Sequence, residues 1–192
     1  MNKKDIPKTG RIGRFAKIVE SKTSSELFLE VMENSHLYDK LKPEKKALWW
    51  KHAIEKLEYG SNKDLATEVI QLCGSKCCGN GQRKTAKRLI NESDSLKEFL
   101  EKFIHYGVKE GELDYEIIDE NTFITKHNKC FCGQVKQLKD NMINDVYCQC
   151  SVEFNRQFFH AAFNKPVKVK LRQSIITGGN CCEFEIRINN ES

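Results

Sequence analysis

Apolar residues recur every three to four positions between residues 23 and 107, a spacing that is typical of amphipathic helices. In the stretch 43–59, for example, Ala47, Trp50, Ile54 and Leu57 share one face. Short polar residues that can cap a helix precede several of these stretches. The predicted helices begin at Thr23, Pro43, Ser61, Gln82 and Ser95.

After Gly111 the period of the apolar positions changes from about 3.6 residues to two, as in strands that expose one face to solvent. From Leu113 to Ile117 apolar residues alternate with acidic ones, and a polar turn follows before Phe123. This pattern predicts a β-hairpin. The later predicted elements are a helix capped by Ser151 and strands at 167–172 and 182–188.

This order of elements indicates an α+β fold. We expect an N-terminal helical half, residues 21–107, packed on a C-terminal antiparallel sheet with one intervening helix, residues 111–192. A chain of 192 residues can bury the core of one domain without disulfides. The sequence therefore predicts a single domain over residues 21–192.

Most of the positive charge lies in the first twenty residues. The chain has a net charge of +5, and residues 1–20 contribute +4 of it through six Lys or Arg and two Asp or Glu. Because the charge is concentrated near one end, it predicts a basic flexible tail rather than a nucleic-acid-binding face.

Several classes of protein are not indicated by the sequence. No run of eighteen apolar residues is present, so no membrane contact is expected. Residues 1–5 lack the apolar segment of a secretory signal, which predicts a cytoplasmic protein.

Cysteines are the most informative residues for function. The chain has nine, and two Cys-x-Cys pairs flank one segment: Cys130 with Cys132, and Cys148 with Cys150. Thiolates are ligands for zinc and for iron–sulfur clusters. The spacing predicts a site where these four residues bind a metal, with zinc or an iron–sulfur cluster as the expected cofactor. Redox-active or incidental disulfides, and inert thiols in a packed loop, are the two alternatives.

Other residues are second-rank candidates for the same site. Cys77 and Cys78 come from the helical half, Cys182 begins the last strand, and His127 precedes Cys130 by three positions. We expect them to complete the site if the topology brings these segments together. A simpler role, as a buried or solvated side chain, is the alternative for Cys182 and His127.

A glycine-bearing loop offers a weaker anion-binding site. Gly79 and Gly81 precede a predicted helix that carries Arg83 and Lys84 near its start. Free amides at a helix start can bind an anion, although the residues required for a phosphate-binding P-loop are missing. A solvated basic helix face is the alternative.

The C-terminal region also resembles known families, on Tyr147-Cys148-Gln149-Cys150-Ser151, Lys165-Pro166-Val167, Ser174-Ile175 and Cys182-Glu183-Phe184. It is similar to a group of uncharacterised bacterial and archaeal proteins related to the L-2-amino-thiazoline-4-carboxylate hydrolase family. It resembles vinyl-4-reductase-type ligand-binding domains more distantly. The resemblance implies an α+β fold and a small-ligand pocket with cysteines near it. The histidine and further cysteine expected after Cys77-Cys78-Gly79 are replaced by Asn80 and Gln82.

These observations predict a small-molecule or anion-binding domain with a cysteine-rich, metal-binding site. The alternative is a hydrolase acting on a small sulfur-containing heterocycle. The expected partner is a small-molecule ligand, and nucleic acid and membranes are not expected.

Overall fold

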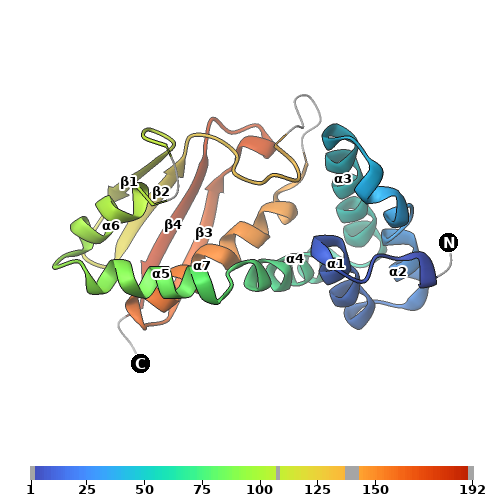
Figure 1. Cartoon of the computed structure of the whole chain (residues 1–192), viewed down its shortest axis with the longest axis horizontal. Coiled ribbons are helices and arrows are strands. Elements are labelled where there is room, and N and C mark those ends of the chain that lie inside the picture. The colour runs from blue at the N-terminus through green and yellow to red at the C-terminus, as the bar shows by residue number, and fades with distance from the viewer. Residues whose placement is uncertain (1–2, 107–108, 137–142, 190–192) are drawn as a thin grey trace.

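The computed structural model describes residues 3–106, 109–136 and 143–189 of the chain. Helices precede strands, and one further helix separates the two hairpin-forming pairs of strands. This is the predicted α+β fold (Figure 1). The α-helices are α1 (Gly10–Lys22), α2 (Ser25–Val31), α3 (Pro43–Gly60), α4 (Lys63–Cys77), α5 (Asn80–Asn91), α6 (Leu96–Ile104) and α7 (Gln149–Phe163). The strands are β1 (Leu113–Ile117), β2 (Thr122–His127), β3 (Val167–Gln173) and β4 (Cys182–Ile188), and the 3-10 helices are η1 (Lys3–Asp5), η2 (Ser35–Lys40), η3 (Asp145–Cys148) and η4 (Ile175–Thr177).

The four strands form one antiparallel sheet in the order β1-β2-β4-β3, which confirms the predicted sheet. The last hairpin pairs opposite charges across β3 and β4: Lys170 lies opposite Glu185, and Arg172 forms an ion pair with Glu183 at 3.2 Å. A register shift between Leu171 and Gln173 separates these two pairs. The charged side chains alternate with core residues along β3, so one face of the sheet is polar.

Two apolar cores are built on different elements. The first core joins α1, α2, α3, α4 and η3 around Phe15, Trp50 and Leu57. The second joins α5, α6, α7 and the sheet around Phe99, Phe123 and Phe159. In Figure 1, α1, α2 and α3 stand apart from the sheet, and α4 runs between the two groups.

The prediction of a flexible tail at residues 1–20 is wrong for residues 3–20, the part that the structure describes. Helix α1 occupies most of it, and Ile12, Phe15, Ala16 and Val19 are buried in the first core. These residues have the i, i+3, i+4, i+7 spacing of one helix face. Arginines and lysines occupy the solvent-facing positions between these residues. They make the segment look uniformly basic in composition, which hides the helical spacing of its apolar residues.

Three predicted helix ends also differ in the structure. Ser24 rather than Thr23 caps α2, and its Oγ accepts a hydrogen bond from the Leu27 amide at 3.3 Å. A glycine after an apolar helical stripe predicts that the helix beginning at Ser61 ends at Gly74, but α4 continues to Cys77. Helix α7 begins at Gln149, before the predicted cap Ser151.

Gly74 lies inside α4 because another helix passes very close to it. A Cβ atom on Gly74 would lie 2.3 Å from the carbonyl oxygen of Cys150 in α7. The glycine therefore permits close packing of α4 on α7, where the sequence pattern indicates a helix end. Among the described residues, no helix has both the length and the apolar character needed to cross a bilayer.

Candidate functional site

A cavity of about 680 Å³ lies where the two cores meet. Its volume falls within the range of small-molecule sites, about 300–1,000 Å³. Residues of α1, α4, α5, α6, α7 and the sheet all contribute to its wall. The apolar part of the wall consists mainly of Phe103, Leu113, Phe154, Phe158, Ile176 and Phe184.

Six cysteines line this one cavity, although they come from four separate segments. The four predicted from the Cys-x-Cys pairs are joined by two of the second-rank candidates. The six are Cys77, Cys130, Cys132, Cys148, Cys150 and Cys182. Cys78 does not line the cavity but is buried in the second core.

A metal centre on these cysteines stays a prediction. Within residues 3–106, 109–136 and 143–189, no group of three or more His, Cys, Asp or Glu side chains is arranged to hold a metal ion. Burial raises the pKa of Cys148 to about 12 and that of Cys150 to about 11. These two groups are therefore thiols near neutral pH in the metal-free protein. Zinc or an iron–sulfur cluster at this site is not shown.

Arg11 places a positive charge in the cavity wall. Its guanidinium carbon lies 5.5 Å from the centre of the Trp50 ring and 6.0 Å from that of Tyr147. Its Nη2 donates to the Tyr147 hydroxyl at 3.3 Å and to the Cys150 sulfur at 3.8 Å. Aromatic faces and weak acceptors thus hold the guanidinium in a fixed position.

No carboxylate neutralises Arg11 among the residues that the structure describes, since every ion pair found there involves other cations. Burial alone would lower the pKa of Arg11, but Tyr147, Cys132 and Cys150 around it raise the pKa above its ordinary value. The guanidinium is therefore charged at any physiological pH. Tyr147 stays a neutral phenol because burial raises its pKa far above the ordinary value.

Cys130 and Cys182 form a pair of interacting thiols. A hydrogen bond between their side chains raises the pKa of Cys130, which retains the proton, and burial raises it further. The same hydrogen bond lowers the pKa of Cys182. The pKa of Cys182 thus shifts in the opposite direction from those of Cys148 and Cys150.

His127 also faces the cavity, as a neutral imidazole. Burial lowers its pKa to about 4. Its ring lies 5.4 Å from the rings of both Phe131 and Phe184, and its Nε2 is buried with no hydrogen-bond partner. A bound ligand could supply that partner.

The four residues of the predicted anion-binding loop are not among those that line the cavity. Gly79 is the N-cap of α5, and Gly81 lies in its first turn. The positive charge of Arg83 acts to lower the pKa of buried Cys78, while Lys84 is exposed. Gln82, between Gly81 and Arg83, does line the cavity. Anion binding by Gly79, Gly81, Arg83 and Lys84 stays a prediction.

The comparisons with known proteins identify a family without assigning an activity. The sequence profile described as "Family of unknown function (DUF6144)" matches residues 13–192, which is nearly the whole chain. The chain belongs to the DUF6144 family. No curated protein matches it.

One solved structure similar to this DUF6144 protein is an H-NOX domain from Shewanella oneidensis, described in an Fe(II)CO ligation state. The two are 9% identical, the alignment covers 94% of this chain and 98% of that chain, and the TM-score is 0.41. A likeness of this extent establishes neither a shared ligand nor a shared activity. The resemblance to thiazoline-carboxylate hydrolases and vinyl-4-reductase-type domains is not supported, since much of it is strand alternation that many antiparallel sheets share.

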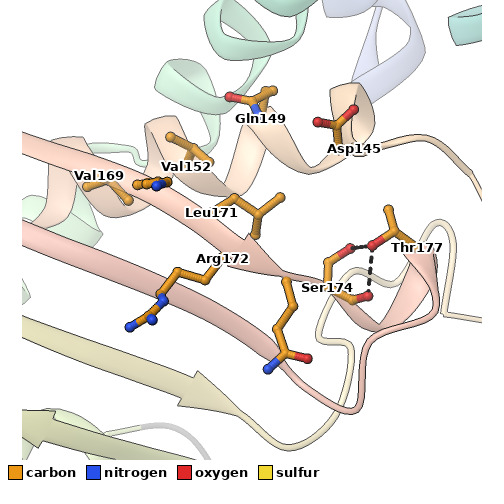
Figure 2. Close-up of a pocket in the computed structure, with 10 residues that line it drawn as sticks. Asp145, Gln149, Val152, Val169, Leu171, Arg172, Ser174 and Thr177 are labelled. Atoms are coloured by element: carbon orange, nitrogen blue, oxygen red, sulfur yellow. Dashed lines mark hydrogen bonds between the residues drawn. The ribbon is translucent and has the colours of Figure 1, made fainter.

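A second, smaller cavity of about 330 Å³ separates the start of α7 from β3 in this DUF6144 protein (Figure 2). Its wall is mostly polar, and several of its polar groups have partners within the protein. Arg172 pairs with Glu183, Asp145 with Lys63, and the Ser174 hydroxyl with that of Thr177 at 2.9 Å. The larger cavity, with its uncompensated cation, is therefore the better candidate site.

Two important residues of the larger cavity were missed by the sequence reasoning. Arg11 was assigned to the flexible tail, and Tyr147 was considered only as part of a motif. The helical spacing of Ile12, Phe15 and Val19 was the available signal, because it places Arg11 one turn before Phe15 on the same face. No comparable signal links Arg11 to Tyr147, which lies 136 positions away.

Proposed function

We propose that the cavity binds a small organic anion with an apolar body, such as an aliphatic or aromatic carboxylate. The observation that carries this proposal is the Arg11 guanidinium, held in the cavity wall without a carboxylate partner among the described residues. A desolvated charge is costly unless a counter-charge compensates it. A carboxylate from a ligand would provide that charge.

The geometry of Arg11 suits such a ligand. A guanidinium has five N–H donors, and in the described residues the hydrogen bonds of Arg11 come from Nη2 only. The remaining donors are available for a planar, two-oxygen acceptor. The stacking on Trp50 and Tyr147 limits the motion of the guanidinium, which reduces the entropy lost on binding.

The rest of the cavity favours an apolar ligand body. Phe103, Phe154, Phe158 and Phe184 provide aromatic surface, and His127 contributes an uncharged ring. Burying an alkyl or aryl group against this surface contributes about 25 cal/mol per Å². The aromatic wall thus selects for size and apolarity, while Arg11 selects for charge.

Calorimetric titration of the purified protein with octanoate and with uncharged octanamide tests this proposal. We expect octanoate to bind and octanamide to bind far more weakly. Replacing Arg11 by Gln removes a charge-assisted interaction of about 1.5–3 kcal/mol, which is roughly a tenfold to hundredfold increase in Kd. Arg14→Gln is the matched control, because Arg14 is exposed on the same helix.

Two results would contradict the proposal. One is equal affinity of the parent protein and the Arg11→Gln variant for octanoate, with thermal unfolding showing both to be folded. The other is the absence of octanoate binding up to millimolar concentration. Arg11→Lys separates charge from shape, since it keeps the charge but loses the planar two-point contact.

The predicted hydrolase alternative has no comparable support. His127 is the histidine that lines the cavity, and its buried Nε2 has no partner that it could activate within the described residues. Hydrolysis of a sulfur-containing heterocycle stays a prediction.

A further inference from the structure

Arg11, Tyr147 and Cys132 form a continuous chain of contacts in the cavity wall, although they come from three separate segments. Nη2 of Arg11 donates to the Tyr147 hydroxyl at 3.3 Å, and the Cys132 sulfur lies 3.1 Å from that same hydroxyl oxygen. Tyr147 is buried, so the hydroxyl that joins the two side chains is held by the core. The Cys132 sulfur is therefore within reach of a small group bound to the Arg11 guanidinium.

This contact distinguishes Cys132 from the other five cysteines of the cavity. Among the described residues, it is the cysteine whose sulfur meets a hydroxyl that is itself bonded to Arg11. Cys150 contacts Arg11 directly at 3.8 Å, but burial keeps it a thiol by raising its pKa to about 11. Cys132 is partly exposed and stands between two exposed residues, Phe131 and Gly133. A molecule that enters the cavity can thus reach the Cys132 sulfur.

We propose that Cys132 is a nucleophile that captures electrophilic carboxylates as covalent adducts in the cavity. The ligand class is the 4-oxo-2-enoates, in which a carbon–carbon double bond joins a carboxylate to a ketone. The inference rests on the proposed function, because Arg11 holds the carboxylate and thereby brings the neighbouring carbon to Cys132. The alkyl chain beyond the ketone then lies along the aromatic wall of the cavity.

The reaction is an addition that needs no co-reactant and releases no leaving group. The Cys132 sulfur forms a bond to C2, the carbon that carries the carboxylate, and the π bond between C2 and C3 breaks. The electron pair of that π bond moves toward the ketone, and the proton of the thiol finally joins C3. All atoms of the thiol and of the ligand remain in the thioether product.

Tyr147 is placed to assist the attack. Once the Cys132 sulfur has lost its proton, the Tyr147 hydroxyl can act toward it only as a hydrogen-bond donor, because Tyr147 remains a phenol. The oxygen of that hydroxyl accepts from Arg11, and hydrogen bonds in such a chain strengthen one another. Tyr147 is therefore a positioning residue for the sulfur, whatever the charge of the ligand.

Adduct mapping with 4-oxo-2-nonenoate and its uncharged amide tests the proposal. Reduced protein is incubated with either compound, digested with trypsin and analysed by mass spectrometry. We expect the carboxylate to add to Cys132 faster than the amide does, and saturating octanoate to suppress the addition. The tryptic peptide 130–136 also contains Cys130, so fragmentation of the peptide must locate the adduct.

Variants separate the three contacts. Cys132→Ser should abolish the adduct, whereas Cys130→Ser, on the same tryptic peptide, should leave it unchanged. Arg11→Gln should slow the carboxylate roughly tenfold more than the amide, because only the carboxylate loses a charged partner. Tyr147→Phe should slow both compounds to a similar extent, since the sulfur loses its donor in both reactions.

The outcomes distinguish this inference from the proposed function. If octanoate binds through Arg11 but the parent protein forms no adduct, or forms it on another cysteine, the inference is overturned and the proposed function stands. If octanoate does not bind and Arg11→Gln reacts with the carboxylate as fast as the parent protein does, both are overturned. Because the parent protein itself shows where the adduct forms, a variant that fails to fold does not prevent the test.

Discussion

His127 shows how burial in the cavity wall sets the behaviour of a single residue. Its folded pKa of about 4 lies below the ordinary value of about 6.5. Between these values the unfolded chain binds a proton that the folded protein does not bind. Acidification through this range therefore favours unfolding, and the stability that depends on neutral His127 is present above about pH 6.5.

The resulting loss of stability can be measured. From His127 alone we expect the free energy of unfolding to be about 1.4 kcal/mol lower at pH 5.5 than at pH 7.5, and roughly 3 kcal/mol lower below pH 4. Urea unfolding of the parent and of His127→Gln at the two higher pH values gives the difference. The variant should lose this part of the pH dependence, whereas His52→Gln, at an exposed position, should retain it. An identical pH dependence for the parent and His127→Gln would contradict the assignment.

Helix α1 makes the N-terminal segment part of the folded core. Phe15 is fully buried and contacts Trp49 and Trp50, with ring centres 6.3 and 4.9 Å away. Phe15→Ala should therefore lower the free energy of unfolding by about 3–5 kcal/mol. Lys17→Ala, on the exposed face of the same helix, should change it by less than about 0.5 kcal/mol. Equal stability of the two variants in urea would indicate that α1 is a dispensable extension.

The contact between α4 and α7 gives a second test at Gly74. A methyl group there would collide with the backbone of Cys150, which cannot move away as a flexible side chain could. Gly74→Ala should cost about 1–3 kcal/mol or more in urea unfolding. Gly81→Ala, in α5 with open space around its Cβ position, should be neutral or slightly stabilising. A neutral Gly74→Ala would show that the two helices are packed less closely.

These elements also show what could be predicted from the sequence and why the rest could not. The strands were predictable because Leu113–Ile117 and Cys182–Ile188 alternate between core and polar residues. The continuation of α4 through Gly74 was not, because the reason for that glycine lies in α7. Charge density obscured α1, since the residues exposed on its outer face are largely basic.

The cavity itself is a product of the whole topology. The strand order β1-β2-β4-β3 brings the end of β2 beside the start of β4, and the packing of α1 near η3 brings Arg11 to Tyr147. Local spacing therefore identified the cysteines as candidates for one site, but it could not show that Arg11 joins them. The metal centre that the same spacing predicts stays a prediction.

Mapping of octanoate binding by NMR tests the central claim most directly. In a titration of isotope-labelled protein, we predict shifts of the Arg11 side-chain resonances. The resonances of Phe158 and Phe184, which belong to the second core and line the same cavity, should shift with them. Arg14, exposed on the same helix as Arg11, should be unaffected. Shifts confined to exposed basic residues, or the absence of shifts at Arg11 when octanoate is saturating, would contradict the account.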